Sequence, residues 1–166
     1  MQKTLAILNE LEAAGLVERY AIGGAMAAFF YAEAVITEDL DAFVLFKTSN
    51  GLISLTPIYD FLKQRGATEE REHLWLAGTL VQLIPAYDAL TEEAVREAIE
   101  KTVGQTKTRI MRVEHLIAIA LKTGRAKDYI RVALLLEEAE VDDARLRDIL
   151  SRQELQDRWE KYKLKS

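Results

Sequence analysis

The chain has 166 residues, of which 49% are hydrophobic and 30% charged, and this suits one globular domain with room for a helical appendage. The net charge of −5 and the pI near 5.2 give no sign of a large nucleic-acid footprint, although a local basic patch stays open. The absence of cysteine excludes disulfides and thiolate metal sites, and the two histidines, His73 and His115, are too far apart for an HExxH-type zinc site. No apolar run reaches the roughly 18 residues of a membrane span and the N-terminal segment has no signal-peptide layout, so we expect a cytoplasmic protein.

Helical and strand patterns alternate over the first two thirds of the sequence. Leu5, Leu8 and Leu11 have helical spacing, with Gly15 after them as a C-cap. Two short apolar segments on either side of Gly78 predict a β-hairpin. We expect helices over 3–14, 25–34, 55–65 and 91–102, strands over 20–22, 40–46 and 106–111, the hairpin within 73–86, and a loop at 48–51.

From Val113 onward the pattern is helical throughout. We expect helices over 113–124, 126–140, 142–151 and 153–165. No proline- or glycine-rich linker divides the chain. The sequence therefore predicts an α+β fold in which residues 1–112 form a small mixed β-sheet flanked by helices, and residues 113–166 form a helical C-terminal part packed on it.

Gly23 and Gly24 stand between a predicted strand and a predicted helix. Glycine lets the backbone come close to a ligand, and the first turn of a helix offers free N–H groups, so this junction could bind phosphate. A Gly-Gly pair alone is more often an ordinary turn, and that alternative stays open.

Asp39 and Asp41 lie one residue apart at the start of a predicted strand, where alternate side chains point the same way. Two neighbouring carboxylates repel each other, and their burial is unfavourable unless a cation lies between them. Paired oxygen ligands suit Mg²⁺, which typically takes one or two carboxylates together with substrate phosphates. The alternative is a solvated strand end.

A basic segment with Lys122, Arg125 and Lys127 follows much later in the chain. Such cations can neutralise phosphate charge, although Lys127 and Asp128 could equally form an ordinary pair on a helix surface.

The order of these features resembles the nucleotidyltransferase fold of the polymerase-β type. There a hydrophobic residue and a glycine pair, here Ile22-Gly23-Gly24, precede a helix and then an Asp-x-Asp strand, here Asp39-Leu40-Asp41. The stretch Lys122-Thr123-Gly124-Arg125-Ala126-Lys127-Asp128 is similar to the abortive-infection nucleotidyltransferase toxin family. The resemblance covers roughly residues 15–135, and it implies binding of Mg²⁺ and a nucleoside triphosphate, with transfer of a nucleoside monophosphate to a hydroxyl group of an RNA, such as a tRNA, or of a protein.

The resemblance also implies a role for individual residues. Asp39 and Asp41 would be the catalytic metal ligands. The nucleotide-binding residues would be Gly23, Gly24, Thr37, Lys122, Lys127 and Asp128.

One position departs from the superfamily pattern, which usually has a third carboxylate on a later strand. Alternation places Gln82 there, and a glutamine amide cannot accept a proton as a carboxylate can. Asp88 or Glu72 could substitute, but nothing in the sequence places them at the site.

Two alternatives to an active transferase therefore stay open. The first is a catalytically degenerate binding or regulatory module, for example one half of a toxin–antitoxin-like pair. The second is an unrelated α/β domain whose Asp-x-Asp ends a strand by accident. We expect His73 to be exposed and His115 to lie at the boundary of a helix.

Overall fold

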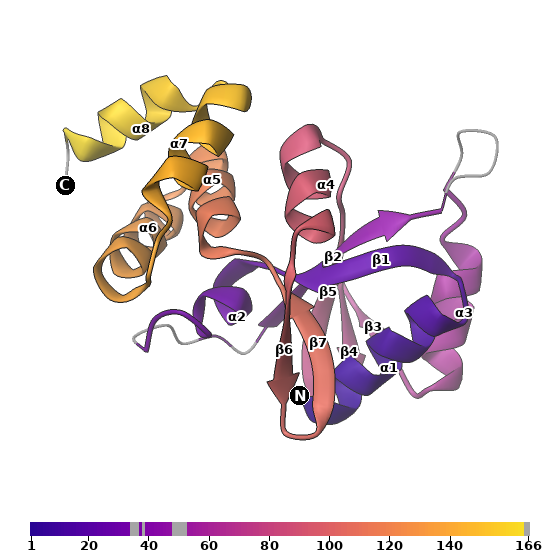
Figure 1. Cartoon of the computed structure of the whole chain (residues 1–166). Helices are drawn as coiled ribbons and strands as arrows, with labels where there is room; N and C mark the ends of the chain where they lie inside the picture. The colour runs from indigo at the N-terminus through magenta and orange to yellow at the C-terminus, as the bar shows by residue number, and fades with distance from the viewer. Residues whose placement is uncertain (34–36, 38, 48–52, 165–166) are drawn as a thin grey trace.

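A mixed sheet forms the centre of the molecule. The computed structural model describes residues 1–33, 37, 39–47 and 53–164, so the loop expected at 48–51 lies outside the described residues. The strands are β1 (Val17–Ile22), β2 (Asp39–Phe46), β3 (Thr68–Glu70), β4 (His73–Leu76), β5 (Thr79–Pro85), β6 (Ile99–Val103) and β7 (Thr106–Ile110). They form one seven-stranded sheet in the order β3-β4-β5-β2-β1-β7-β6, in which β2 runs parallel to β5 and antiparallel to β1 (Figure 1).

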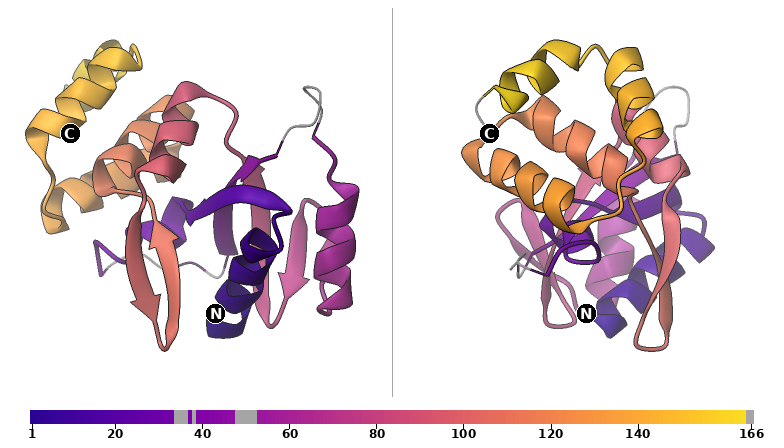
Figure 2. Two further views of the ribbon diagram at one scale, coloured as in Figure 1. Left: turned by 45° about the vertical axis from the view of Figure 1, so that its right-hand side comes forward. Right: turned by 60° about the vertical axis from the view of Figure 1, so that its left-hand side comes forward.

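Helices cover both faces of this sheet. They are α1 (Gln2–Ala13), α2 (Gly24–Ala28), α3 (Thr56–Gln64), α4 (Ala89–Arg96), α5 (Val113–Thr123), α6 (Ala126–Glu138), α7 (Asp143–Arg152) and α8 (Gln156–Lys163). Neighbouring residues of β1 point to opposite faces: the Tyr20 hydroxyl donates to Asn9 of α1 at 2.6 Å, whereas Arg19 donates to the Val95 carbonyl of α4 at 3.2 Å. The last four helices gather on one side of the sheet (Figure 2). This arrangement confirms the predicted α+β class, and none of the described helices is long and apolar enough to cross a bilayer.

The predicted hairpin is confirmed as β4 and β5, which pair antiparallel through Leu74–Val81, Trp75–Leu80 and Leu76–Thr79. Its two-residue turn is Ala77-Gly78, and both residues have positive φ, 49° and 84°. Positive φ at both positions is typical of a type I′ turn, whose twist matches that of the paired strands. An alanine was a weak signal for this turn, because a residue with a Cβ is uncommon in this conformation.

Two predicted helices are wrong in extent. The helix expected over 91–102 ends at Arg96, and Ile99–Val103 is strand β6, because Gly104, with a φ of 61°, turns the chain back so that β6 can pair with β7. The helix expected over 25–34 ends at Ala28. There the backbone tightens, since the N–H of Tyr31 donates to the carbonyl of Ala28 at 2.9 Å.

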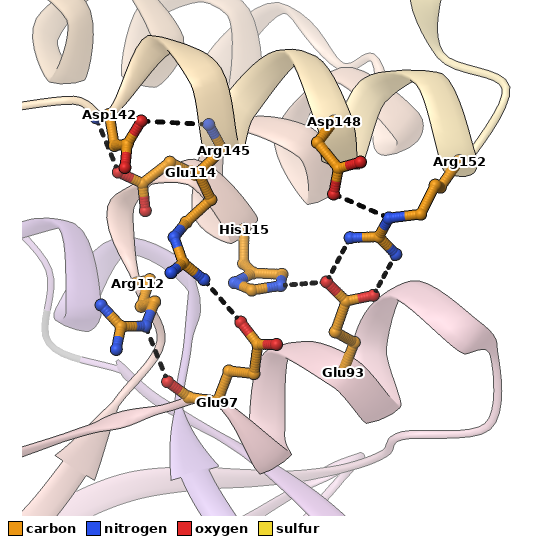
Figure 3. A network of polar contacts seen from close by, with 9 residues as sticks. All are labelled: Glu93, Glu97, Arg112, Glu114, His115, Asp142, Arg145, Asp148 and Arg152. Carbon is orange, nitrogen blue, oxygen red and sulfur yellow. Dashed lines mark hydrogen bonds and ion pairs between the residues drawn. The ribbon is translucent and has the colours of Figure 1, made fainter.

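A polar network joins α4 of the sheet region to the C-terminal helices (Figure 3). Arg152 of α7 donates to both carboxylate oxygens of Glu93 at 2.6 and 2.9 Å, and His115 Nε2 of α5 lies 3.1 Å from Glu93 Oε1. Arg145 of α7 donates to Glu97 at 2.8 Å. This network, together with the apolar packing of α5 on α4, fixes the helix that forms one wall of the cavity described next.

Candidate active site

A cavity of about 430 Å³ opens between the sheet and the C-terminal helices. Its floor is formed by β2 and β5, and apolar side chains of α5, including Leu116 and Ile119, form one wall. The first turns of α6 and the segment from the β3–β4 turn into β4 complete it. The cavity therefore collects side chains from segments that are far apart in the sequence.

The two aspartates predicted from the strand pattern lie together on the cavity floor. Asp39 and Asp41 line the cavity, while Leu40 between them is fully buried on the opposite face of the sheet. Burial raises the pKa of Asp41, the charge of Arg131 opposes that shift, and the neighbouring Asp39 adds to it. Among the described residues, neither carboxylate accepts a hydrogen bond, so both have oxygen lone pairs available.

The glycine pair is required by its contact with β2. Gly24 has a φ of +58°, and a Cβ there would lie 1.8 Å from Oδ2 of Asp41. A Cβ on Gly23 would lie 2.5 Å from the ring of Phe43, and the Gly23 N–H donates to the Asp41 carbonyl at 2.9 Å. Helix α2 has only five residues, so its dipole at this junction is small. The glycines thus let Asp41 fit against the backbone, which the sequence pattern did not indicate.

The N-cap and the first turns of α6 bring three cations to the cavity, Arg125, Lys127 and Arg131. Asp128 lies beneath them and is 1% exposed. It accepts hydrogen bonds from Arg125 at 2.7 and 3.2 Å and from Arg131 at 3.4 Å. Burial alone would raise the pKa of Asp128, but the hydrogen bonds and charge of Arg125, with the charge of Arg131, lower it. Asp128 therefore holds two guanidinium groups in place.

Lys122 is not among the residues that the structure brings to the cavity. Its Nζ donates to Oδ2 of Asp88 at 2.9 Å. Asp88 in turn caps α4, accepting from the N–H of Thr91 at 2.9 Å. Asp88, considered above as a substitute for the missing carboxylate, is therefore occupied elsewhere.

Gln82 lies where alternation placed it, paired with Asp41 in the β2–β5 ladder and lining the cavity. Thr37 lines it too, and its hydroxyl accepts from the Asp39 N–H at 3.3 Å. Glu72 and His73 also line the cavity, and the expectation of an exposed His73 is wrong, since its side chain is 20% exposed. Alternation along β4 could have predicted the position of His73: because Leu74 is buried on one face of the sheet, His73 lies on the other, which faces the cavity.

Outside this cavity, two glutamates and a histidine form a group whose side-chain types could hold a metal ion. Atoms of Glu93, Glu97 and His115 come within 4.8 Å of one another. Both carboxylates already pair with guanidinium groups, and Arg152 lowers the pKa of Glu93 to about 2 against the effect of burial. His115 lies in the first turn of α5, at the helix boundary as expected, and is fully buried; its Nδ1 has no hydrogen-bond partner among the described residues. This group is best explained as the connection between α4, α5 and α7.

The mixed seven-stranded sheet flanked by helices matches the nucleotidyltransferase-like fold of solved structures. The chain is similar in structure to the antibiotic-resistance factor ANT(2'')-Ia in solution, with a TM-score of 0.55 and 15% identity over 98% of this chain and 95% of that one. It is similar to ANT(2'')-Ia in complex with adenylyl-2''-tobramycin, with a TM-score of 0.55 and 16% identity over 92% and 94% of the two chains. A nucleotidyltransferase-like antigenic protein from Paracoccidioides brasiliensis gives a TM-score of 0.53 and 12% identity over 80% of this chain and 72% of that one.

At these identities the likeness shows the fold. The fold is thus nucleotidyltransferase-like rather than another kind of α/β fold. No protein-family model matches the chain, and no curated protein matches it.

Proposed function

We propose that this protein binds a magnesium–nucleoside triphosphate in the cavity and transfers its nucleoside monophosphate to an acceptor hydroxyl. One observation carries the proposal: Asp39 and Asp41 share a cavity with three cations of α6. Carboxylates suit a hard divalent cation, and guanidinium and ammonium groups suit phosphate. A polyanionic ligand with a bound metal ion can interact with the carboxylates through the metal and with the three cations through its phosphates.

The residues of the floor fit a magnesium ion. Asp39 and Asp41 present oxygen atoms from one face of β2, and burial disfavours the ionised form of Asp41 until a cation compensates its charge. Bound there, Mg²⁺ would neutralise phosphate oxygens and orient the triphosphate for in-line displacement. Gly24 contributes by leaving room for the Asp41 carboxylate.

The α6 wall would hold the phosphates. Arg131 and Arg125 are held by Asp128, so they lose less conformational freedom on binding than free surface side chains do. Lys127 is exposed at the same cavity and adds a third positive charge. The three cations would stabilise the negative charge of the phosphates as pyrophosphate departs.

A second candidate function rests on Gln82, which lies in the ladder position beside Asp41. Nucleotidyl transfer removes a proton from the acceptor hydroxyl, and an amide cannot accept it. A protein that binds nucleotide at this site without transferring it, as a regulatory module, is therefore the alternative.

The identity of the acceptor is also part of the proposal. The similarity of residues 122–128 to the abortive-infection toxin family favours an RNA or protein hydroxyl. The complex of one structural neighbour with adenylyl-2''-tobramycin supports a sugar hydroxyl instead. Pyrophosphate release in the presence of each acceptor class distinguishes them.

The first experiment is a thermal shift with each nucleoside triphosphate, in Mg²⁺ or in EDTA. A ligand at 100 times its Kd adds about 2.7 kcal/mol, so we expect a higher Tm with Mg²⁺ only. The double variant Asp39→Asn/Asp41→Asn should lose this shift, whereas Asp60→Asn, an exposed aspartate on α3, should keep it. An unchanged shift in the double variant would contradict the site. Pyrophosphate release then separates transfer from binding alone.

A further inference from the structure

A row of three side chains crosses the cavity floor from strand to strand. Asp41 of β2 pairs with Gln82 of β5, and the antiparallel register of Leu74 with Val81, continued by one residue, sets His73 of β4 beside Gln82. Asp41, Gln82 and His73 all line the cavity. A proton acceptor is thus placed one strand further from the aspartates than the position that Gln82 occupies.

His73 has the chemistry that Gln82 lacks. A neutral imidazole accepts a proton near neutral pH, and an amide does not. Among the described residues, the ring of His73 makes no hydrogen bond, and its Nδ1 lies 3.9 Å from Oε1 of Glu72, beyond hydrogen-bond distance. The ring is therefore available to a ligand, and the nearby carboxylate of Glu72 can stabilise its protonated form.

The other histidine cannot take this part. His115 is fully buried, lies against Glu93 on α4 and does not line the cavity. The exposed Glu72 could accept a proton, but it borders the cavity from the turn before β4 rather than from the row beside Gln82.

We propose that His73 is the catalytic residue that accepts the proton of the acceptor hydroxyl, in place of a carboxylate at residue 82. This inference rests on the proposed nucleotidyl transfer. The acceptor oxygen forms a bond to the α-phosphorus, the bond from that phosphorus to the bridging oxygen breaks, and pyrophosphate leaves with the electron pair. The hydroxyl proton passes to the imidazole of His73, and the charge of Glu72 stabilises the imidazolium.

The activity test uses radiolabelled nucleoside triphosphates with Mg²⁺, glycerol at high concentration as the hydroxyl probe, and pyrophosphate release as the signal. His73→Gln should keep the Mg²⁺-dependent thermal shift of the wild type and lose about 10²- to 10⁴-fold in rate. Glu70→Gln is the matched control, because Glu70 is exposed and pairs with His73 in the β3–β4 ladder. Its rate should be unchanged.

Two rescue experiments separate proton transfer from a structural effect. Adding Gln82→Asp to His73→Gln should restore rate, because a carboxylate then stands beside Asp41. Free imidazole should restore part of the rate of His73→Ala. Full activity in His73→Gln with binding intact would overturn the inference and leave the proposed function standing. A wild type that binds nucleotide but releases no pyrophosphate with any probe would overturn it too.

A spectroscopic readout does not depend on turnover. With two histidines in the chain, nitrogen-15 labelling of histidine gives two sets of ring signals. A non-hydrolysable triphosphate with Mg²⁺ should shift the His73 signals and leave His115 as an internal reference. Unmoved His73 signals in the bound protein would overturn the inference. Absence of any binding would instead refute the proposed function itself.

Discussion

Asp41 is the residue around which the rest of the candidate site is arranged. Its main chain accepts from Gly23, its side chain fills the space that a Cβ on Gly24 would occupy, and its ladder partner is Gln82. The carboxylate is thereby held with little freedom, as its proposed role as a metal ligand requires. Its position depends on a glycine as much as on the strand that carries it.

Gly24→Ala should destabilise the protein more than a change of backbone conformation alone explains. A left-handed φ costs alanine about 1–2 kcal/mol. The control Gly66→Ala has a φ of +84° and no atom within 4 Å of the added Cβ, so it carries only this cost. Gly24→Ala also forces the Asp41 carboxylate away, which should add about 1–3 kcal/mol. Urea unfolding of the two variants measures the difference, and equal losses would contradict the packing argument.

Asp128→Asn should weaken nucleotide binding through the arginines that it holds. An asparagine retains the shape of Asp128 but loses the charge that orients Arg125 and Arg131. Because hydrogen bonds to charged groups contribute about 1.5–3 kcal/mol, we expect a loss of stability in this range and a lower affinity for nucleotide. Calorimetric titration with Mg²⁺ and nucleotide is the measurement, with Asp143→Asn on the exposed side of α7 as the control. Unaltered affinity would contradict the proposal that Asp128 positions Arg125 and Arg131 for phosphate binding.

At the level of elements, the sequence predicted best where one periodicity ran without interruption. The helices of the last third and the β4–β5 hairpin were found, because their apolar residues repeat at a single spacing. Strand β6 was taken as the end of a helix, since its pairing with β7 depends on the turn at Gly104. Strand β3 was missed because all its residues are exposed and two are glutamates.

The candidate site was predicted in the same uneven way. Asp39, Asp41 and Gln82 follow from alternation along two strands, and Lys127 from a basic pattern. The same pattern also favoured Lys122, which instead pairs with Asp88. Sequence spacing does not determine which side chains at the end of a helix face a cavity. Such a choice depends on how α5 packs against α4, which is a tertiary contact.

The network between α4 and α7 should make stability depend on pH. The pKa of Glu93 is lowered from 4.5 to about 2 in the folded protein by Arg152 and His115. A lowered carboxylate pKa stabilises the fold above pH 4.5, and this contribution is lost as the pH falls from 4.5 towards 2. Glu93→Gln should therefore cost stability at neutral pH and little near pH 2. Asp148→Asn, which changes an exposed i,i+4 pair with the same arginine, should cost less than about 1 kcal/mol. A pH-independent difference between wild type and Glu93→Gln, measured by urea unfolding, would contradict this assignment.

At the scale of the whole molecule, the sheet region and the C-terminal helices share one hydrophobic core. The same cluster of buried residues contains Leu5 of α1, Leu40 of β2 and Leu121 of α5. The boundary that we propose between residues 112 and 113 therefore separates a sheet region from a helical region within one core. We expect the two parts to unfold together. The cavity between them then exists only when both are folded.

The two tryptophans allow this cooperativity to be measured, because Trp75 lies on β4 and Trp159 on α8. The single-tryptophan variants Trp159→Phe and Trp75→Phe should give coincident unfolding curves in urea. Leu121→Ala, which removes a fully buried side chain from α5, should shift both curves equally and cost about 2–5 kcal/mol. If the Trp159 curve alone moved, the C-terminal helices would be an independent unit. A shared transition means instead that a ligand bound between the floor and the α6 wall raises the stability of both parts, so either tryptophan would report nucleotide binding as a shift of the same curve.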